Sequence, residues 1–274
     1  MAPAVAVLGV VTAYPVLWVF WLSLQERVPI FDIARFAGVR HYLFLAGDPR
    51  FLAAAKTTLL FTAASVAVET ALGLAVALAL AGQRRGRRLG FALLLLAWAM
   101  PAVVTARMFE WLYHPAAGVV NVLIGGARIN WLGDPALALP AVVLADVWRT
   151  LPFVAVLAYA RRLGIPAELY EAAQVDGAGR LAVFTRITLP LLGPVLVVAV
   201  LFRTLDALRA FDIMFVLTGG GPANVTETLT IYAYRALFQM LQFGFGSAIG
   251  VVVFAMVMAV AWLYVRRLHP ETRS

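Results

Sequence analysis

The sequence predicts an all-α integral membrane protein with six transmembrane helices and both termini in the cytoplasm. Three observations carry this prediction. Of the 274 residues, 63% are hydrophobic and only 13% are charged, with a mean hydropathy of +0.91, which excludes an ordinary water-soluble globule. Six stretches approach or reach the ~20 apolar residues that a helix needs to span a bilayer. Arginines concentrate in alternate loops, which is typical of the cytoplasmic side.

The six apolar segments extend over most of the chain. They are, in order, Ala2 to Leu24, Thr57 to Ala81, Leu89 to Phe109, Ala136 to Ala160, Ile187 to Leu208 and Phe243 to Val265. The first has no basic N-terminal region and is longer than the apolar core of a signal peptide, so it is interpreted as a span. No linker or convincing internal repeat separates the segments. Residues 1–274 are therefore expected to form one transmembrane domain.

Loop charge predicts the orientation of these spans. Three arginine-rich regions are expected in the cytoplasm, because positive charge marks that side of a membrane. Their arginines are Arg84, Arg85, Arg87 and Arg88; Arg161, Arg162, Arg180 and Arg186; and Arg266, Arg267 and Arg273. The first outer loop also carries Arg27, Arg35, Arg40 and Arg50, so the loops expected in the cytoplasm differ from this loop in how densely arginines occur, not in whether they occur.

Ionisable residues lie within the predicted spans, where they are costly and tend to face a bundle interior or a watery cavity. A spacing of three places Asp146 with Arg149 on one helix face, and Arg203, Asp206 and Arg209 on another. Two such polar stripes facing each other would line a cavity suited to a polyhydroxylated ligand, and we favour this interpretation over simple charge neutralisation.

For two further charges within the spans, Glu69 and Arg107, we favour neutralisation inside the helix bundle. Lys56 is the only lysine and follows Ala55, so a Gly-Lys-Ser/Thr phosphate loop cannot occur and the chain is not expected to hydrolyse ATP. With no cysteine and only three scattered histidines, no metal site is expected. No catalytic residue is predicted. Without a basic stripe interleaved with aromatics, nucleic-acid binding is not expected either.

The segment between the fourth and fifth spans holds the most specific pattern. Pro166 and Glu168 begin a helix, Gly177 and Gly179 break it, and helical spacing resumes at Arg180. The pattern consists of Glu171-Ala172-Ala173, Asp176-Gly177-Ala178, Phe184, Ile187, Pro190 and Pro194. It resembles the EAA loop of membrane subunits of binding-protein-dependent ABC importers.

A second block is similar to the sugar-importing branch of that family. It comprises Phe211-Asp212, Leu217 to Pro222 and Thr226 to Leu229, and Ala13 to Pro15 and Trp131 to Pro135 fit the branch as well. The branch includes the larger maltose-importer permease and permeases of trehalose and glycerol-phosphate importers. The resemblance implies the type I ABC importer permease fold in its minimal six-span form, in the cytoplasmic (inner) membrane of a bacterium or archaeon. Although the glycines from Gly219 onward resemble a phosphate cradle, a turn is favoured there.

The resemblance also implies partners. The chain would form a heterodimer with a second permease, embedded in membrane lipid, and would work with two ATPase subunits that bind ATP and magnesium and with an extracytoplasmic solute-binding protein. No cofactor is expected in this chain itself. Residues 161–187 would form a cytoplasmic coupling loop that docks on the ATPase. Its implied coupling residues are Glu171, Ala172, Ala173, Asp176, Gly177 and Ala178.

The family finally implies a substrate path, because sugar contacts in the larger maltose-importer permease come from the helices before and after this loop. The matching positions are Asp146, Arg149, Thr150, Phe153, Val154, Arg203, Asp206, Ala207 and Ala210. Aspartate and arginine stand here where that relative carries amides and small residues. The expected substrate is a di- or oligosaccharide such as trehalose or maltose, or a related glycoside. Glycerol phosphate or another anionic glycoside is an alternative substrate. Two other classes of protein, a secondary transporter and a membrane-embedded enzyme, are alternatives to an importer permease.

Overall fold

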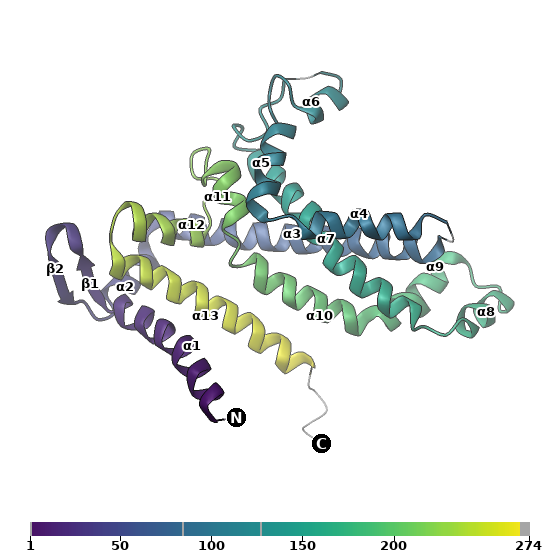
Figure 1. The fold of residues 1–274 in the computed structure, drawn as a ribbon, viewed down its shortest axis with the longest axis horizontal. Coiled ribbons are helices and arrows are strands. Elements are labelled where there is room, and N and C mark those ends of the chain that lie inside the picture. Colours follow the sequence, from purple (N-terminus) through teal and green to yellow (C-terminus); the bar gives the residue numbers. More distant parts are fainter. Residues whose placement is uncertain (1, 84, 127, 269–274) are drawn as a thin grey trace. The chain divides into compact units, whose positions relative to one another are not determined.

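The computed structural model describes residues 2–83, 85–126 and 128–268, and these form a largely helical chain (Figure 1). Arg84 and Arg273, two of the arginines used to predict the orientation, lie outside the described residues. Contacts divide the chain into two compact units. Unit 1 comprises Met1–Leu60, Leu132–Ala138 and Leu208–Ser274, and unit 2 comprises Phe61–Trp131 and Leu139–Ala207. Each unit is assembled from segments far apart in the sequence.

Unit 1 is built on two apolar helices, α1 (Ala2–Ser23) and α13 (Phe243–Leu268), which pack side by side (Figure 1). A β-hairpin follows α1, with β1 (Gln25–Val28) antiparallel to β2 (Ile33–Phe36) and a 3-10 turn, η1 (Pro29–Phe31), between them. Next come α2 (Arg40–Gly47) and the first turns of α3 (Pro49–Gly82). The hairpin therefore lies at the end of the helix pair where α1 stops and α13 begins.

Three short helices complete unit 1: α11 (Asp212–Thr218), α12 (Leu229–Tyr234) and the π-helical η3 (Arg235–Gln239). Its core is formed by side chains such as Leu45, Leu229 and Ile249, which are at most 2% exposed. The hydroxyl of Thr58 on α3 accepts a hydrogen bond from the backbone N–H of Leu229 at 3.0 Å. This bond caps α12 against α3, because the first N–H groups of a helix have no partner within it.

Unit 2 packs the remainder of α3 against α7 (Ala138–Leu163) and α10 (Leu189–Ala207) around an apolar core. Close approach is possible because Gly73 has no side chain: a Cβ there would lie 2.8 Å from the Cβ of Val154. The core is completed by residues such as Leu192 and Ala199, which are fully buried. α7 and α10, which lie before and after the predicted coupling loop (residues 161–187), are thereby fixed to α3.

The third predicted span is not a single straight helix. It forms α4 (Arg87–Ala99) and α5 (Ala102–Leu112), which meet at an angle of 103°. The break falls at Met100 and Pro101, because a residue before proline is driven out of the helical region, and Met100 has φ −73° and ψ 131°. A short helix, α6 (Val119–Leu123), follows. The segment predicted as a span from Leu89 to Phe109 is therefore sharply bent, and its crossing of the membrane stays a prediction.

Four helices in the described part of the chain are long and apolar enough to cross a membrane, and the bent pair α4–α5 adds a fifth candidate. The four are Pro49–Gly82, Ala138–Leu163, Arg180–Ala207 and Phe243–Arg266. For the first predicted span, the apolar stretch Gly9–Ser23 is shorter than the others. The predicted membrane-protein class agrees with these helices, whereas six spans and the orientation of the termini stay predictions.

Candidate functional site

A buried arginine joins three carboxylates in unit 2. Arg203 on α10 donates from Nε to Glu69 Oε2 at 2.5 Å, from Nη2 to Asp146 Oδ2 at 3.0 Å and from Nη1 to Asp206 Oδ2 at 2.5 Å. A second arginine, Arg149, places Nη2 3.4 Å from Asp146 Oδ1. The cluster, defined by these five residues, links α3, α7 and α10 and contains three acids and two bases.

Burial divides this ion-pair cluster into an inner and an outer part. Glu69, Asp146 and Arg203 are at most 4% exposed, so each depends on the others for charge compensation. By contrast, the side chain of Asp206 is 49% exposed and that of Arg149 is 22% exposed. The inner three charges hold the helices together, and the outer two remain within reach of a molecule outside unit 2.

The segment between α7 and α10 forms the expected helix, glycine turn and second helix. α8 (Glu168–Val175) is followed by Asp176 and then by Gly177, whose φ of +72° is readily adopted by glycine alone. The N–H of Ala178 closes the turn by donating to the carbonyl of Ala173 at 2.9 Å, as in a Schellman helix end.

The second helix of this segment leads into the next long helix without a break. α9 (Arg180–Val183) continues through the π-helical η2 (Phe184–Thr188) into α10. Leu189 donates its N–H to Phe184, five residues earlier. Pro190, the next residue, has no N–H, and wide turns of this kind commonly occur where the helical ladder is perturbed. The predicted coupling loop is therefore continuous with α10, part of a candidate membrane span.

Side chains tie α8 to the ends of α7 and α10. The guanidinium of Arg162 stacks 4.0 Å above the ring of Tyr170, whose hydroxyl lies 3.3 Å from Thr188 Oγ1. The face turned away from these anchors is exposed, and it includes apolar side chains: Val175 is 89% exposed and Leu181 is 75% exposed. Uncovered apolar groups on an anchored helix pair are typical of a protein–protein contact.

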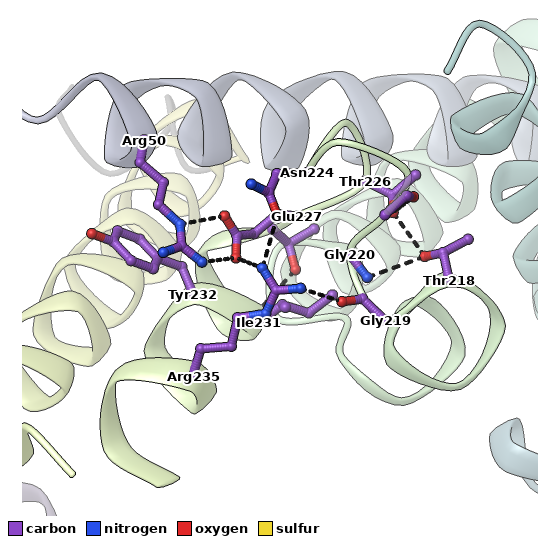
Figure 2. A network of polar contacts seen from close by, with 12 residues as sticks. Arg50, Thr218, Gly219, Gly220, Asn224, Thr226, Glu227, Ile231, Tyr232 and Arg235 are labelled. Atoms are coloured by element: carbon purple, nitrogen blue, oxygen red, sulfur yellow. Dashed lines mark hydrogen bonds and ion pairs between the residues drawn. The ribbon is translucent and has the colours of Figure 1, made fainter. Parts of the chain in front are cut away.

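A second polar network holds the loop between α11 and α12 in unit 1 (Figure 2). The buried Glu227 accepts two hydrogen bonds from Arg50, at 2.8 and 2.7 Å, and another from Arg235. Arg235 also donates to the carbonyl of Gly219 at 2.7 Å and to Asn224 Oδ1 at 2.9 Å. Gly219 to Pro222 thus form a turn fixed by protein groups, as favoured from the sequence.

Tyr232 extends the network of Figure 2 to the start of α3. Its ring lies 4.6 Å from the guanidinium carbon of Arg50, and its hydroxyl donates to Asp48 Oδ2 at 2.7 Å. Burial, together with the hydrogen bond to Asp48, raises the pKa of Tyr232 above its usual value. The phenol therefore stays protonated and keeps donating at physiological pH.

The profile of one protein family, described as the inner membrane component of binding-protein-dependent transport systems, matches residues 70–274. The chain belongs to this family. The matched region contains both the ion-pair cluster, apart from Glu69, and the coupling segment. The family membership predicted from the pattern around Glu171 is confirmed.

Individual relatives resemble this permease over nearly its whole length. It is 40% identical over 267 residues to the trehalose/maltose transport system permease protein MalF of Thermococcus litoralis, covering 96% of this chain and 90% of that protein. It is 39% identical over 280 residues to the sulfoquinovosyl glycerol transport system permease protein SmoG of Agrobacterium fabrum, covering 99% and 89%.

A solved structure of a bacterial alginate ABC transporter, in complex with a periplasmic protein that binds alginate pentasaccharide, contains a similar chain. The TM-score is 0.85 at 22% identity, covering 100% of this permease and 93% of that chain. This likeness concerns the fold alone, and it agrees with the predicted type I ABC importer permease fold.

The structure brings only some of the permease's predicted substrate-path residues together. Asp146, Arg149, Arg203 and Asp206 meet in the cluster, and the Thr150 hydroxyl donates to the Asp146 carbonyl at 2.8 Å. The others occupy different surroundings: Val154 and Ala207 are buried, Phe153 packs against the apolar core, and Ala210 belongs to unit 1.

Glu69 and Arg107, both interpreted as bundle charges, have different roles. Glu69 indeed neutralises a charge between helices, but its partner is Arg203 of the proposed substrate path, a connection not anticipated from the sequence. Thr58, Thr62 and Ser65 precede Glu69 at helical spacing, a polar stripe that could have indicated a buried partner. Arg107 instead pairs with Glu110 on its own helix, with both side chains largely exposed.

Proposed function

We propose that this chain is a permease subunit of an ATP-driven ABC importer and forms, with a second permease, the translocation path for a di- or oligosaccharide or a related glycoside. Its near full-length identity of 39–40% to permeases of trehalose/maltose and sulfoquinovosyl glycerol transport systems carries this proposal. In the proposed assembly, six spans place both termini in the cytoplasm. Two ATPase subunits and an extracytoplasmic solute-binding protein complete the importer in the inner membrane.

Within this path, the substrate meets the outer part of the ion-pair cluster. Asp206 offers carboxylate oxygens to sugar hydroxyls, and Arg149 offers N–H donors. The Nε of Arg149 is buried and donates to no residue in the described part of the chain, so its hydrogen-bonding capacity is not used up. Arg203, Glu69 and Asp146 act as positioning residues, because their own contacts fix the backbone that carries the outer pair.

Coupling occurs through α8. The partner ATPase covers its exposed face, including Glu171 and Val175, and closure of the ATPase on ATP moves α8 as a rigid body. The Arg162–Tyr170 stack transmits this motion to α7, and the unbroken path from α9 into α10 transmits it to the other side of the cluster. ATP and magnesium are bound by the ATPase, so this chain is not itself an enzyme.

Arg149, whose side chain is 22% exposed and whose contact with Asp146 is 3.4 Å long, favours a second candidate substrate, an anionic glycoside. A sulfonate or phosphate would give this guanidinium a second charged partner beside Asp146, whereas an uncharged sugar would add only neutral hydrogen bonds. The two candidates differ in their dependence on this side chain. Arg149→Gln should abolish the response to an anionic glycoside and only weaken the response to a disaccharide.

The test is the ATPase activity of the co-purified complex in lipid, with its solute-binding protein and a panel of trehalose, maltose, glycerol phosphate and sulfoquinovosyl glycerol. Stimulation by one ligand, lost in Asp206→Asn while the complex still assembles, supports the proposed path. An isolated chain that transports or transforms a substrate without any ATPase would refute the importer proposal and favour a secondary transporter or an enzyme.

A further inference from the structure

A pocket of about 250 Å³ opens in unit 1 between the hairpin, α2 and the start of α13. Its lining combines charged and aromatic side chains, including Arg27 of β1, Arg40 and Phe44 of α2, and Phe245 of α13. The ring of His41 closes one side, with Nε2 3.0 Å from the carbonyl oxygen of Gln25. The pocket therefore offers positive charge next to apolar surface.

The charge of the pocket is unbalanced. Arg27 and Arg40 line it together with a single carboxylate, that of Glu26. Glu26 Oε2 accepts a hydrogen bond from Arg35 Nε at 2.9 Å and lies 3.8 Å from Arg40 Nη1, so its main partner is an arginine that does not line the pocket. No described residue forms an ion pair with Arg27. The pocket is thus suited to one anionic group.

The pocket lies at one end of two apolar helices, α1 and α13. α1 ends at Ser23, shortly before β1, and α13 begins at Phe243 beside the lining residue Phe245 (Figure 1). Large apolar side chains between the hairpin turn and α2 are 61–72% exposed, and one of them, Phe44, lines the pocket: Ile30, Phe31, Phe36, Val39, Leu43 and Phe44. Arginines beside exposed aromatic and aliphatic groups are typical of a lipid interface.

We propose that this pocket binds the phosphodiester of an anionic phospholipid. Guanidinium groups recognise phosphate oxygens with paired hydrogen bonds, and Arg27 and Arg40 supply two such groups. Phe44 and Phe245 supply the apolar surface along which the glycerol and acyl chains leave the pocket. The exposed apolar side chains around it favour a lipid over a free anion, because a soluble ligand would leave them in water. The proposal explains why an outer loop retains arginines that the orientation rule disfavours.

Native mass spectrometry of the complete complex, released from nanodiscs of mixed phosphatidylglycerol and phosphatidylcholine, tests this site. Retention of phosphatidylglycerol should fall at least ~5-fold in the double variant Arg27→Gln/Arg40→Gln, because each arginine favours an anionic headgroup by a few-fold. Arg128→Gln is the matched control: it also removes a positive charge from a loop expected outside the membrane, but Arg128 is exposed and does not line the pocket, so retention should match the unaltered protein. Phe44→Ser should weaken retention without removing charge.

Equal retention by all four proteins would overturn the proposal. So would displacement of the bound lipid by millimolar inorganic phosphate or glycerol phosphate in detergent, because that result identifies a site for a soluble anion. Sugar-stimulated ATPase activity of the same samples separates this inference from the proposed transport function: a complex that responds to sugar but retains no lipid overturns only the lipid site.

Discussion

Replacing Arg203 by methionine should destabilise the permease strongly. Arg203 compensates Glu69, Asp146 and Asp206, and the first two are at most 3% exposed. Without it, Asp146 still has Arg149 3.4 Å away, whereas Glu69 has no other ion-pair partner among the described residues. One uncompensated buried carboxylate costs roughly 3–5 kcal/mol of unfolding free energy.

The expected readout is the thermal midpoint of the purified complex, followed by fluorescence-detected size-exclusion chromatography after heating. For a chain of this size, about 2–4 °C per kcal/mol converts the loss into a midpoint lower by ~6–20 °C. Asp206→Asn is the control, because its half-exposed pair contributes only ~0–1 kcal/mol. It should shift the midpoint by a few degrees at most while reducing transport sharply.

A double variant tests the same charge compensation. Arg203→Met combined with Glu69→Leu removes two of the three buried charges and leaves the third, Asp146, with Arg149, so it should recover much of the stability lost by Arg203→Met alone. A midpoint for Arg203→Met within 2–3 °C of the unaltered protein, or a double variant no more stable than the single one, would refute the assignment of Arg203 as the compensating charge of the bundle.

Three other predictions concern the coupling helix, the polar loop and the orientation. Gly177→Asp should uncouple ATP hydrolysis from uptake, because the backbone φ of +72° at residue 177 costs a residue other than glycine roughly 1–2 kcal/mol. Gly179→Asp is the control, since residue 179 has a φ of −69°. Unchanged uptake by an assembled Gly177→Asp complex would exclude the docking role. Glu227→Gln leaves Arg50 and Arg235 without their carboxylate partner, so the rate of amide hydrogen exchange in residues 218–228 should rise at least ~10-fold. Exchange in α8 should not change. Equal exchange rates in residues 218–228 of the variant and the unaltered protein would show that the network does not order this loop. Because the chain has no cysteine, a Gln83→Cys variant should react with a membrane-impermeant maleimide only from the cytoplasmic side, and Ala223→Cys only from outside; the reverse pattern would invert the proposed topology.

Much of the coupling segment was predictable because its determinants are local. Proline and acid near a helix start and glycine at a helix end act within a few residues, and α8 and Gly177 follow these signals. The continuation of α9 into α10 was less predictable. Whether the helix passes Thr188 and Pro190 depends on a single widened turn, for which the local pattern offers no clear marker.

The polar residues of the candidate substrate path were predicted as two stripes on facing helices, and the structure joins members of both stripes in the ion-pair cluster. Helical spacing placed Arg203 and Asp206 on one face, and they do pair. Helical spacing could not show that Glu69 also accepts a hydrogen bond from the guanidinium of Arg203, because that pairing depends on which face α3 turns toward α10.

The sequence by itself determined the membrane class, the family and the helix–turn–helix of the coupling segment, because composition, apolar run length and glycine placement act along the chain. Tertiary structure alone decided which distant charges meet. Glu69 and Arg203 are 134 residues apart, and Arg50 and Glu227 are 177 apart. It also gathered the hairpin, α2 and α13 into the arginine-lined pocket. Low-dielectric surroundings make such pairings obligatory, but the packing of the helices selects the partners.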